Sequence, residues 1–214
     1  MQHNTDNVRI ISSAPMVAPN TLIDKLPLSE KAASGVVTSR NTIKNILYGN
    51  DNRLMVLVGP CSIHDTKAAM EYANKLVKLK EELAEDLFVV MRVYFEKPRT
   101  TVGWKGLIND PYLDESFDID KGLETARKLL VDLGEISMPV GVEYLDVLTP
   151  QYLSDLISWG AIGARTTESQ SHRELASALS CPVGFKNGTG GSLEIAIDAI
   201  QSANSPHHLL SVNK

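Results

Sequence analysis

Residues 54–94 read LMVLVGPCSIHDTKAAMEYANKLVKLKEELAEDLFVVMRVY, and this stretch decides the fold. It begins with an aliphatic run, Leu54–Val58, and ends with a second apolar run, Leu87–Tyr94. Residues 66–83 between them repeat apolar side chains at helical spacing, and Asp65 stands where an N-cap is expected. Two apolar strands joined by a helix predict a parallel βαβ unit, because only a long crossover returns the chain in the same direction.

The same alternation of short apolar runs and amphipathic helices continues along the chain. Three further strands are predicted at Val140–Tyr144, Ala161–Arg165 and Val183–Lys186. The boundary signals of the remaining helices are Ile119 and Gly134 for one, Thr149-Pro150 and Gly160 for the next, and Ser192 as the cap of the last. Because the strands are apolar throughout rather than alternating, we expect burial on both faces of the sheet.

Two architectures accommodate five βα units: an open doubly wound sheet and a (β/α)₈ barrel. A closed barrel needs eight units and typically about 250 residues, whereas residues 54–214 supply five units. The stretch Leu209–Lys214 is typical of a strand that begins and does not continue. We therefore expect an incomplete parallel α/β domain.

Residues 1–50 depart from this pattern and are expected to form a separate N-terminal region. The first 28 residues are polar, contain three prolines and show no sustained period, which predicts an extended arm. From Glu30 to Leu47 the apolar spacing predicts a helix. Residues 51–214 form the predicted α/β domain.

Composition narrows the class of protein. Of the 214 residues, 43% are hydrophobic, which is enough apolar material for a large core. The net charge of -5 argues against a general nucleic-acid or anionic-membrane binder, because no overall positive field attracts phosphate groups. Two cysteines predict a reducing compartment, and no apolar run is long enough to span a bilayer. The first residues, Met1 to Asn4, do not have the basic region and apolar stretch that are typical of a signal peptide. We expect a cytoplasmic protein.

Charged residues gather where the predicted strands end. Parallel βα units place the carboxyl ends of all strands at one face, so five cations are expected to converge there: Arg92, Lys97, Arg99, Arg165 and Lys186. Cations this close repel one another unless an anion compensates them, so phosphate or carboxylate ligands suit the site. The alternative is that each cation is solvated or pairs with a nearby carboxylate, for which the chain offers Glu96, Glu143 and Glu168.

Cys61, which follows the first strand, admits three roles. It is a buried structural thiol, a nucleophile with His64 as the nearest base, or a metal ligand that needs partners from other strand ends. Spacing alone favours the buried thiol. Cys181 precedes a strand and is expected in the core, whereas the other histidines have no ligand-like spacing and are expected at the surface: His3, His172, His207 and His208.

The segment 97–115 is long and irregular and follows a strand, which is typical of a loop that serves a site or an interface. Trp104 within it either covers the mouth of the site or packs against a partner subunit. The sequence leaves both roles open.

Four stretches together resemble the type I 3-deoxy-D-arabino-heptulosonate 7-phosphate (DAHP) synthases. They are GPCSIHD at 59–65, MRVYFEKPRTTVGWKG at 91–106, GARTTES at 163–169 and PVGFKNGT at 182–189. The resemblance extends over essentially all 214 residues, and the KPRT tetrapeptide in the second stretch is highly specific. It implies a (β/α)₈ TIM barrel, of which about five of the eight units are present here.

The resemblance implies a reaction and roles for the charged residues. DAHP synthases condense phosphoenolpyruvate with erythrose 4-phosphate at the entry to the shikimate pathway, which leads to the aromatic amino acids. The residues that match the phosphoenolpyruvate contacts are Arg92, Lys97, Arg165 and Lys186. Those that match the erythrose 4-phosphate contacts are Pro98, Arg99 and Thr100. Glu143 resembles the carboxylate that positions water, so Lys97 and Glu143 are the catalytic candidates.

The resemblance also implies a divalent metal such as Mn, Fe, Co or Zn. Cys61 matches the family's metal-binding cysteine. The other family ligands, together with one more phosphate-binding arginine, lie on the last three barrel strands, which this sequence does not contain. We therefore expect a truncated chain that is inactive and poorly soluble on its own.

Feedback inhibition by an aromatic amino acid is a further implication. The family's effector pocket lies between the N-terminal arm and nearby helices, and the matching positions are Pro150, Gln151, Leu179, Ser180 and Ser211. Ser211 favours phenylalanine over tyrosine. The alternative is that these are ordinary helix-start and loop residues. Relatives are dimers or tetramers, so we expect a homo-oligomer in the full-length form, with residues 1–50 as its oligomer and effector region.

Two other functions stay open. The chain is either a Schiff-base barrel aldolase with Lys186 as nucleophile, or a non-catalytic remnant that binds intact subunits through its arm.

Overall fold

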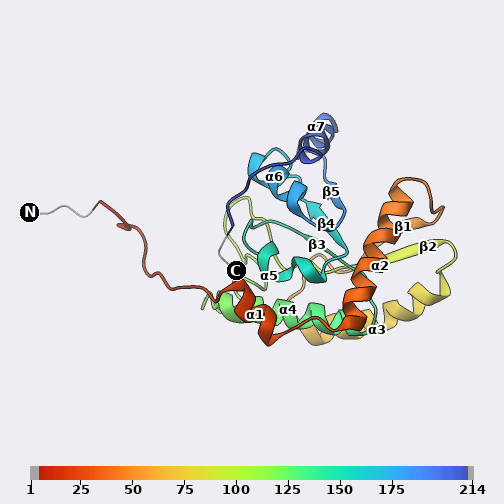
Figure 1. Ribbon diagram of the computed structural model, residues 1–214. Helices are drawn as coiled ribbons and strands as arrows, with labels where there is room; N and C mark the ends of the chain where they lie inside the picture. The colour runs from red at the N-terminus through yellow and green to blue at the C-terminus, as the bar shows by residue number, and fades with distance from the viewer. Residues whose placement is uncertain (1–4, 212–214) are drawn as a thin grey trace, which may run out of the picture.

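The computed structural model describes residues 5–211, which form a five-stranded parallel sheet flanked by helices (Figure 1). The strands are β1 (Leu54–Val58), β2 (Leu87–Arg92), β3 (Val140–Glu143), β4 (Trp159–Ile162) and β5 (Val183–Phe185). They lie side by side in chain order, and every pair is parallel. A doubly wound sheet would reverse its strand order partway, so this order indicates a partial barrel of βα units.

Helices connect the strands and cover the outer face of the sheet. In chain order they are α1 (Pro19–Lys25), α2 (Glu30–Leu47), α3 (Thr66–Glu82), α4 (Ile119–Glu135), α5 (Pro150–Leu153), the 3₁₀ helix η1 (Ser154–Leu156), α6 (Gln170–Ala178) and α7 (Glu194–Ala203). The predicted N-cap of α3 is confirmed, because the Asp65 carboxylate accepts hydrogen bonds from two backbone N–H groups. No helix in the described part of the chain is long and apolar enough to cross a membrane.

Small residues on the concave face let the sheet curl into a half-barrel. A Cβ on Gly141 of β3 would lie 3.3 Å from side-chain atoms of both Leu57 and Trp159. A Cβ on Gly184 of β5 would lie 2.3 Å from the Trp159 ring. Side chains from separate strands therefore meet over glycines, as in the interior layers of a barrel. Because side chains alternate along a strand, the inward positions two residues after Gly141 and Gly184 are Glu143 and Lys186. Arg92 likewise lies two residues after Val90, whose Cγ1 would lie 3.4 Å from a Cβ on Gly141.

Helix α2 of the N-terminal region joins the half-barrel at the end away from those charged residues. The Arg40 guanidinium of α2 donates to the carbonyls of Ser154 at 2.7 Å and Ile157 at 2.9 Å, just before β4. The predicted helix Glu30–Leu47 is confirmed as α2. Residues 5–18 contain no helix or strand. The first of them reach away from the body of the molecule (Figure 1), whereas the Val17 N–H donates to the Asp120 carboxylate at 3.0 Å and its carbonyl accepts from the Tyr152 hydroxyl at 2.7 Å.

Two predicted glycine terminators are wrong. α4 continues through Gly134 to Glu135, and a Cβ on Gly134 would lie 2.9 Å from the Cβ of Ala32 in α2. Gly160 lies inside β4, where a Cβ would lie 2.8 Å from the Tyr144 ring. Both glycines allow a close approach between elements and do not end a helix.

Other boundaries also differ from the prediction. The strand expected at Ala161–Arg165 is β4 and ends at Ile162, because the next residues turn and the Gly163 carbonyl accepts two backbone hydrogen bonds. Ser192 does not cap the last helix, since α7 begins at Glu194 with no side-chain cap.

The predicted arm and final strand are corrected as well. The arm includes α1, whose Pro19 has its φ preset for the first turn and is buried. Residues 209–211 form no strand, and residues 212–214 lie outside the described part of the chain.

Candidate active-site rim

Charged side chains from three strands meet at the carboxyl end of the half-barrel. Glu143, at the end of β3, is 7% exposed, and its Oε2 lies 3.3 Å from the Lys186 Nζ, just after β5. A Cβ on Gly163 would lie 2.0 Å from the Glu143 Oε1. Only glycine leaves room for this carboxylate, so the β4 loop is built around Glu143.

Arg92, the last residue of β2, is held in place by backbone carbonyls and an aromatic ring. Its Nε donates to the Pro60 carbonyl at 3.1 Å and its Nη2 to the Cys61 carbonyl at 3.4 Å. Its Cζ lies 3.6 Å from the centre of the buried Tyr94 ring, and the Lys186 Nζ lies 5.3 Å from the same ring. Arg92 and Lys186 are therefore neighbours.

Cys61 is exposed, so the buried structural role that spacing favours is wrong for this thiol. The Lys97 Nζ donates to the Cys61 Sγ at 2.7 Å, and this hydrogen bond with the lysine's charge lowers the pKa of Cys61 below its usual value. The prediction for Cys181 is confirmed, because it is buried in the core and desolvation raises its pKa. The two thiols thus differ in both access and ionisation.

The described residues do not form a complete metal site. No group of three or more His, Cys, Asp or Glu side chains that could hold a metal ion occurs within residues 5–211. Cys61 offers a single thiolate donor beside Lys97, whereas a bound divalent ion needs several ligands.

Next to this cluster lies a cleft of about 420 Å³ lined by three of the predicted cations, Lys97, Arg99 and Arg165. The Arg165 Nη2 contacts the Thr100 Oγ1 at 3.4 Å. The cleft is also lined by Glu96, Pro98, Lys105, Asn109, Leu145 and Asp146. The structure therefore brings the predicted substrate contacts on the β2 and β4 loops to the same mouth.

The loop that carries Lys97 to Thr100 is an ordered hairpin. Glu96 and Gly106 form an antiparallel bridge, and the Lys97 N–H donates to the Lys105 carbonyl at 2.8 Å. Trp104 packs within this loop, since its indole N–H donates to the Asp110 carbonyl and its own carbonyl accepts from the Arg99 Nε. In this chain the indole thus braces its own loop.

Glu96 is the site residue whose role sequence reasoning missed. Its carboxylate is buried and accepts hydrogen bonds from the N–H groups of Leu145 and Asp146 and from the Thr149 hydroxyl. Burial, with repulsion from Asp146, raises the pKa of Glu96 to about 7. The available signal was its place directly after the apolar run 93–95, where a charged side chain enters the core.

Among residues 5–211, only one of the five predicted cations has a carboxylate partner. Lys186 pairs with Glu143, as the alternative interpretation allows. Within the described residues, no carboxylate oxygen lies within 4.0 Å of the charged groups of Arg92, Lys97, Arg99 or Arg165. These five cations and Glu143 form the rim of the half-barrel. The rim thus carries positive charge that the described part of the chain does not neutralise.

The predicted effector residues lie on three segments. Pro150 and Gln151 begin α5, Leu179 and Ser180 lie between α6 and β5, and Ser211 lies in the irregular segment after α7. His172 is not a free surface residue, because its ring contacts the Ser169 Oγ at 2.9 Å and the Leu145 carbonyl at 2.8 Å.

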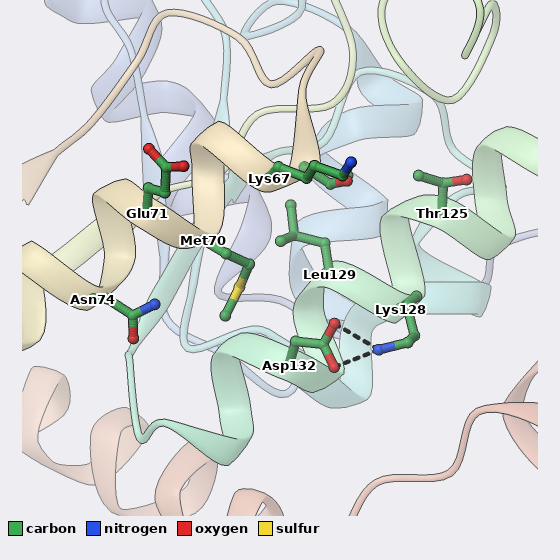
Figure 2. A pocket seen from close by; sticks show the side chains of 9 residues that line it. Lys67, Met70, Glu71, Asn74, Thr125, Lys128, Leu129 and Asp132 are labelled. Carbon is green, nitrogen blue, oxygen red and sulfur yellow. Dashed lines mark hydrogen bonds and ion pairs between the residues drawn. The ribbon is translucent and has the colours of Figure 1, made fainter.

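A second cavity, of about 510 Å³, lies on the outer surface between α3 and α4 (Figure 2). Its lining mixes both charges, and Lys128 is paired with Asp132 one helical turn away at 2.6 Å. This cavity is larger than the cleft at the rim but is a gap between neighbouring helices whose lining carries equal numbers of acidic and basic side chains. The rim therefore remains the stronger candidate for the functional site.

Comparisons with known proteins identify the family to which this chain is similar. The model of the "DAHP synthetase I family" matches residues 25–214. The Phe-sensitive phospho-2-dehydro-3-deoxyheptonate aldolase of Escherichia coli (strain K12) is 60% identical over 214 residues, which are 100% of this chain and 61% of the relative. A Trp-sensitive one from Buchnera aphidicola subsp. Schizaphis graminum is 53% identical over 210 residues, 98% of this chain and 60% of the relative.

A solved structure agrees over the same region. Phospho-2-dehydro-3-deoxyheptonate aldolase from Francisella tularensis SCHU S4 superposes with a TM-score of 0.94 at 54% identity, covering 95% of this chain and 60% of that chain. The chain thus spans about three fifths of the length of the relatives that it matches.

Proposed function

Because this chain belongs to the DAHP synthetase I family, we propose that it forms the substrate-binding part of an enzyme that condenses phosphoenolpyruvate with erythrose 4-phosphate. The observation that carries the proposal is the cluster of cations at the rim, four of which (Arg92, Lys97, Arg99 and Arg165) have no carboxylate partner within the described residues. Two phosphorylated substrates would supply the missing negative charge, and each arginine offers forked donors that suit a phosphate.

The phosphoenolpyruvate site is proposed on the inward side of the rim. Arg92 and Lys186, which face the same Tyr94 ring, would hold its charged groups together with Lys97 and Arg165. Such contacts fix the reacting carbon before the chemistry begins, which is a positioning effect. Glu143 would orient a water molecule near the double bond of the substrate, because its carboxylate is fixed by Lys186 and by the space above Gly163.

The erythrose 4-phosphate site is proposed in the neighbouring cleft. Arg99 and Thr100 would bind its phosphate and Pro98 its chain, with the hairpin 96–106 setting their spacing. The methylene carbon of phosphoenolpyruvate forms a bond to the aldehyde carbon, water adds to the carbon that bears the phosphate ester, and inorganic phosphate leaves. The products, DAHP and phosphate, account for all atoms of the two substrates and one water.

Cys61 would contribute one ligand to a divalent metal whose remaining ligands lie outside residues 5–211. The support is its exposed thiol with a lowered pKa next to Lys97. The residues present do not complete the site, because Cys61 alone cannot hold a divalent ion.

Activity is proposed to require three further βα units that close an eight-stranded barrel. The support is that the relatives are longer, and that β1 and β5 each pair on one side only within the described residues. Leu193, at the N-cap of α7, and Ile197 within α7 are 70% and 54% exposed, as expected of a helix that packs against α6 and lacks a neighbour on its other side.

A chimera tests this function. Residues 1–214 are joined to the remaining part, about two fifths, of the Escherichia coli Phe-sensitive relative, and phosphate release from phosphoenolpyruvate is measured with erythrose 4-phosphate and a divalent metal. We expect release by the chimera and none by the 214-residue chain alone. A folded chimera without release would contradict the proposal, and turnover by the short chain would contradict the requirement for further units.

The rival functions predict other results. A Schiff-base aldolase would be trapped by borohydride at Lys186, but this amine is paired with Glu143 at 3.3 Å rather than surrounded by apolar groups as a nucleophilic lysine is. A non-catalytic remnant would co-purify with an intact subunit and leave its own chimera inactive.

Regulation and assembly are proposed by the same family membership. The relatives carry the names Phe-sensitive and Trp-sensitive, which supports an aromatic amino acid effector near Pro150, Gln151, Leu179, Ser180 and Ser211. The exposed arm residue Ile11 supports a homo-oligomer through residues 1–50, and two free thiols support a cytoplasmic location.

A further inference from the structure

The Tyr94 side chain lies where two strands' cations meet. Tyr94 follows Arg92 by two residues, so both side chains point to the concave face, and the Tyr94 ring is 3% exposed. The Arg92 Cζ lies 3.6 Å from the ring centre and the Lys186 Nζ 5.3 Å from it. Both distances are within the reach of cation–π attraction, which extends to about 6 Å.

This ring takes up none of the N–H donors of its two cations, so those of Arg92 can bind a ligand, while Lys186 is also paired with Glu143 at 3.3 Å. A guanidinium that lies against a ring face keeps its N–H donors in its own plane, and Arg92 gives only two hydrogen bonds to the part of the chain that the structure describes, to the Pro60 and Cys61 carbonyls. Burial raises the pKa of Tyr94, so the ring is a neutral phenol and attracts the cations through its face. A carboxylate in the same place would instead compete with the substrate for them.

The backbone of Tyr94 also binds the loop that contains Cys61. Its carbonyl accepts from the Ile63 N–H at 2.8 Å and from the Ser62 hydroxyl at 3.4 Å. The loop that holds Cys61 is therefore fixed to the residue whose ring sets the positions of Arg92 and Lys186.

We infer that the Tyr94 ring is a positioning group that holds Arg92 and Lys186 at the spacing that the two anionic groups of phosphoenolpyruvate require. The inference rests on the proposed function and adds a residue to it. Without the ring, the two like charges would separate and one of them would have to be drawn back on binding, which weakens affinity.

The test is calorimetric titration of phosphoenolpyruvate into the full 214-residue chain. We expect Tyr94→Leu to weaken binding about tenfold and Tyr94→Phe to stay within about twofold, since the phenylalanine ring keeps its face. Phe88→Leu is the matched control, because it removes another cation–π pair, with Arg53 at 5.6 Å, that lies outside the rim. Equal affinity for wild type and a folded Tyr94→Leu chain would overturn the inference.

A second series avoids loss of folding as an explanation. Phenylalanine with one, two or three ring fluorines at position 94 keeps the ring's shape while weakening the negative potential of its face. We expect phosphoenolpyruvate affinity to fall stepwise with fluorine number, and a flat series would contradict the inference. If the wild-type chain itself does not bind phosphoenolpyruvate, the proposed function fails and the inference with it, which is distinguishable from a flat series in a chain that binds.

Discussion

The same side chain is used in two different ways in this molecule. Arg127 lies in the wall, the layer of helices outside the sheet, whereas other arginines lie at the rim. Arg127 of α4 is fully buried, and its guanidinium donates to the carbonyls of Leu26 and Tyr152 and to both carboxylate oxygens of Asp155. Arg165 at the rim is exposed and contacts a threonine hydroxyl. The wall arginine has its counter-ion within the fold, whereas the rim arginine leaves that role to a ligand.

This difference in pairing predicts that Arg127 contributes to stability, whereas the rim cations contribute to ligand binding. A buried charge must be fully paired, so Arg127 fastens α4 to the N-terminal segment and to η1. An unpaired charge at a mouth contributes little to folding but raises the local attraction for anions. Substitutions in the two regions should therefore affect different measurements.

The largest expected effect is the loss of stability when the buried arginine of the wall, Arg127, is replaced. Arg127→Leu should lower the free energy of unfolding by about 3 kcal/mol, because it leaves Asp155 and two carbonyls without their donor. Arg165→Leu should change it by about 0.5 kcal/mol or less. Urea unfolding followed by circular dichroism compares the two, and equal losses would contradict the distinction.

Glu96 sharpens the comparison, because it is a rim residue buried like a wall residue. The pKa of its carboxyl is raised to about 7 in the folded chain, so the folded state binds more protons than the unfolded state between pH 4.5 and 7. Stability should fall as pH rises through this window, by at most roughly 3 kcal/mol. Glu96→Gln should remove this fall.

The control for that series is Glu168→Gln, which changes an exposed carboxylate at the same end of the sheet. Thermal melts at several pH values should show the fall for wild type and for Glu168→Gln alike. A Glu96→Gln chain with an unchanged pH dependence would mean that another group carries it.

A smaller effect is expected on substrate affinity. In the chimera, Arg165→Leu should weaken phosphoenolpyruvate binding about tenfold, because one charge-assisted contact is lost. Arg127→Leu, studied at a temperature where it stays folded, should bind within about twofold of wild type. Calorimetry measures both, and the reverse order of effects would break the division between wall and rim.

The smallest expected effect concerns the two thiols. Lys97 lowers the pKa of Cys61, so iodoacetamide should modify Cys61 several times faster than the buried Cys181 at neutral pH. Lys97→Met should slow Cys61 labelling, and Lys105→Met on the same hairpin is the matched control. Mass spectrometry of the labelled chain reads both sites, and equal slowing by the two variants would exclude a specific effect of Lys97.

Much of this molecule was accessible from its sequence. The apolar runs locate all five strands, and the rule that parallel strands share one carboxyl end brings Arg92 and Lys186 together although they are far apart in the chain. The rule works because it depends on topology and not on side-chain detail.

What the sequence could not supply depends on distances across the sheet. Gly134 and Gly160 stand where a glycine is expected to end a helix, but each makes room for a side chain from a remote segment. The roles of Glu96 and Tyr94 likewise follow from neighbours that no local spacing encodes, such as Thr149 and Lys186.

The most direct test of the central claim is a crystal structure of the chimera with phosphoenolpyruvate. We predict that its phosphate and carboxylate lie within hydrogen-bond distance of the Arg92, Arg165 and Lys186 side chains, with the Tyr94 ring beneath two of them. Density for the ligand away from this rim, with the same cations facing only solvent, would contradict the account.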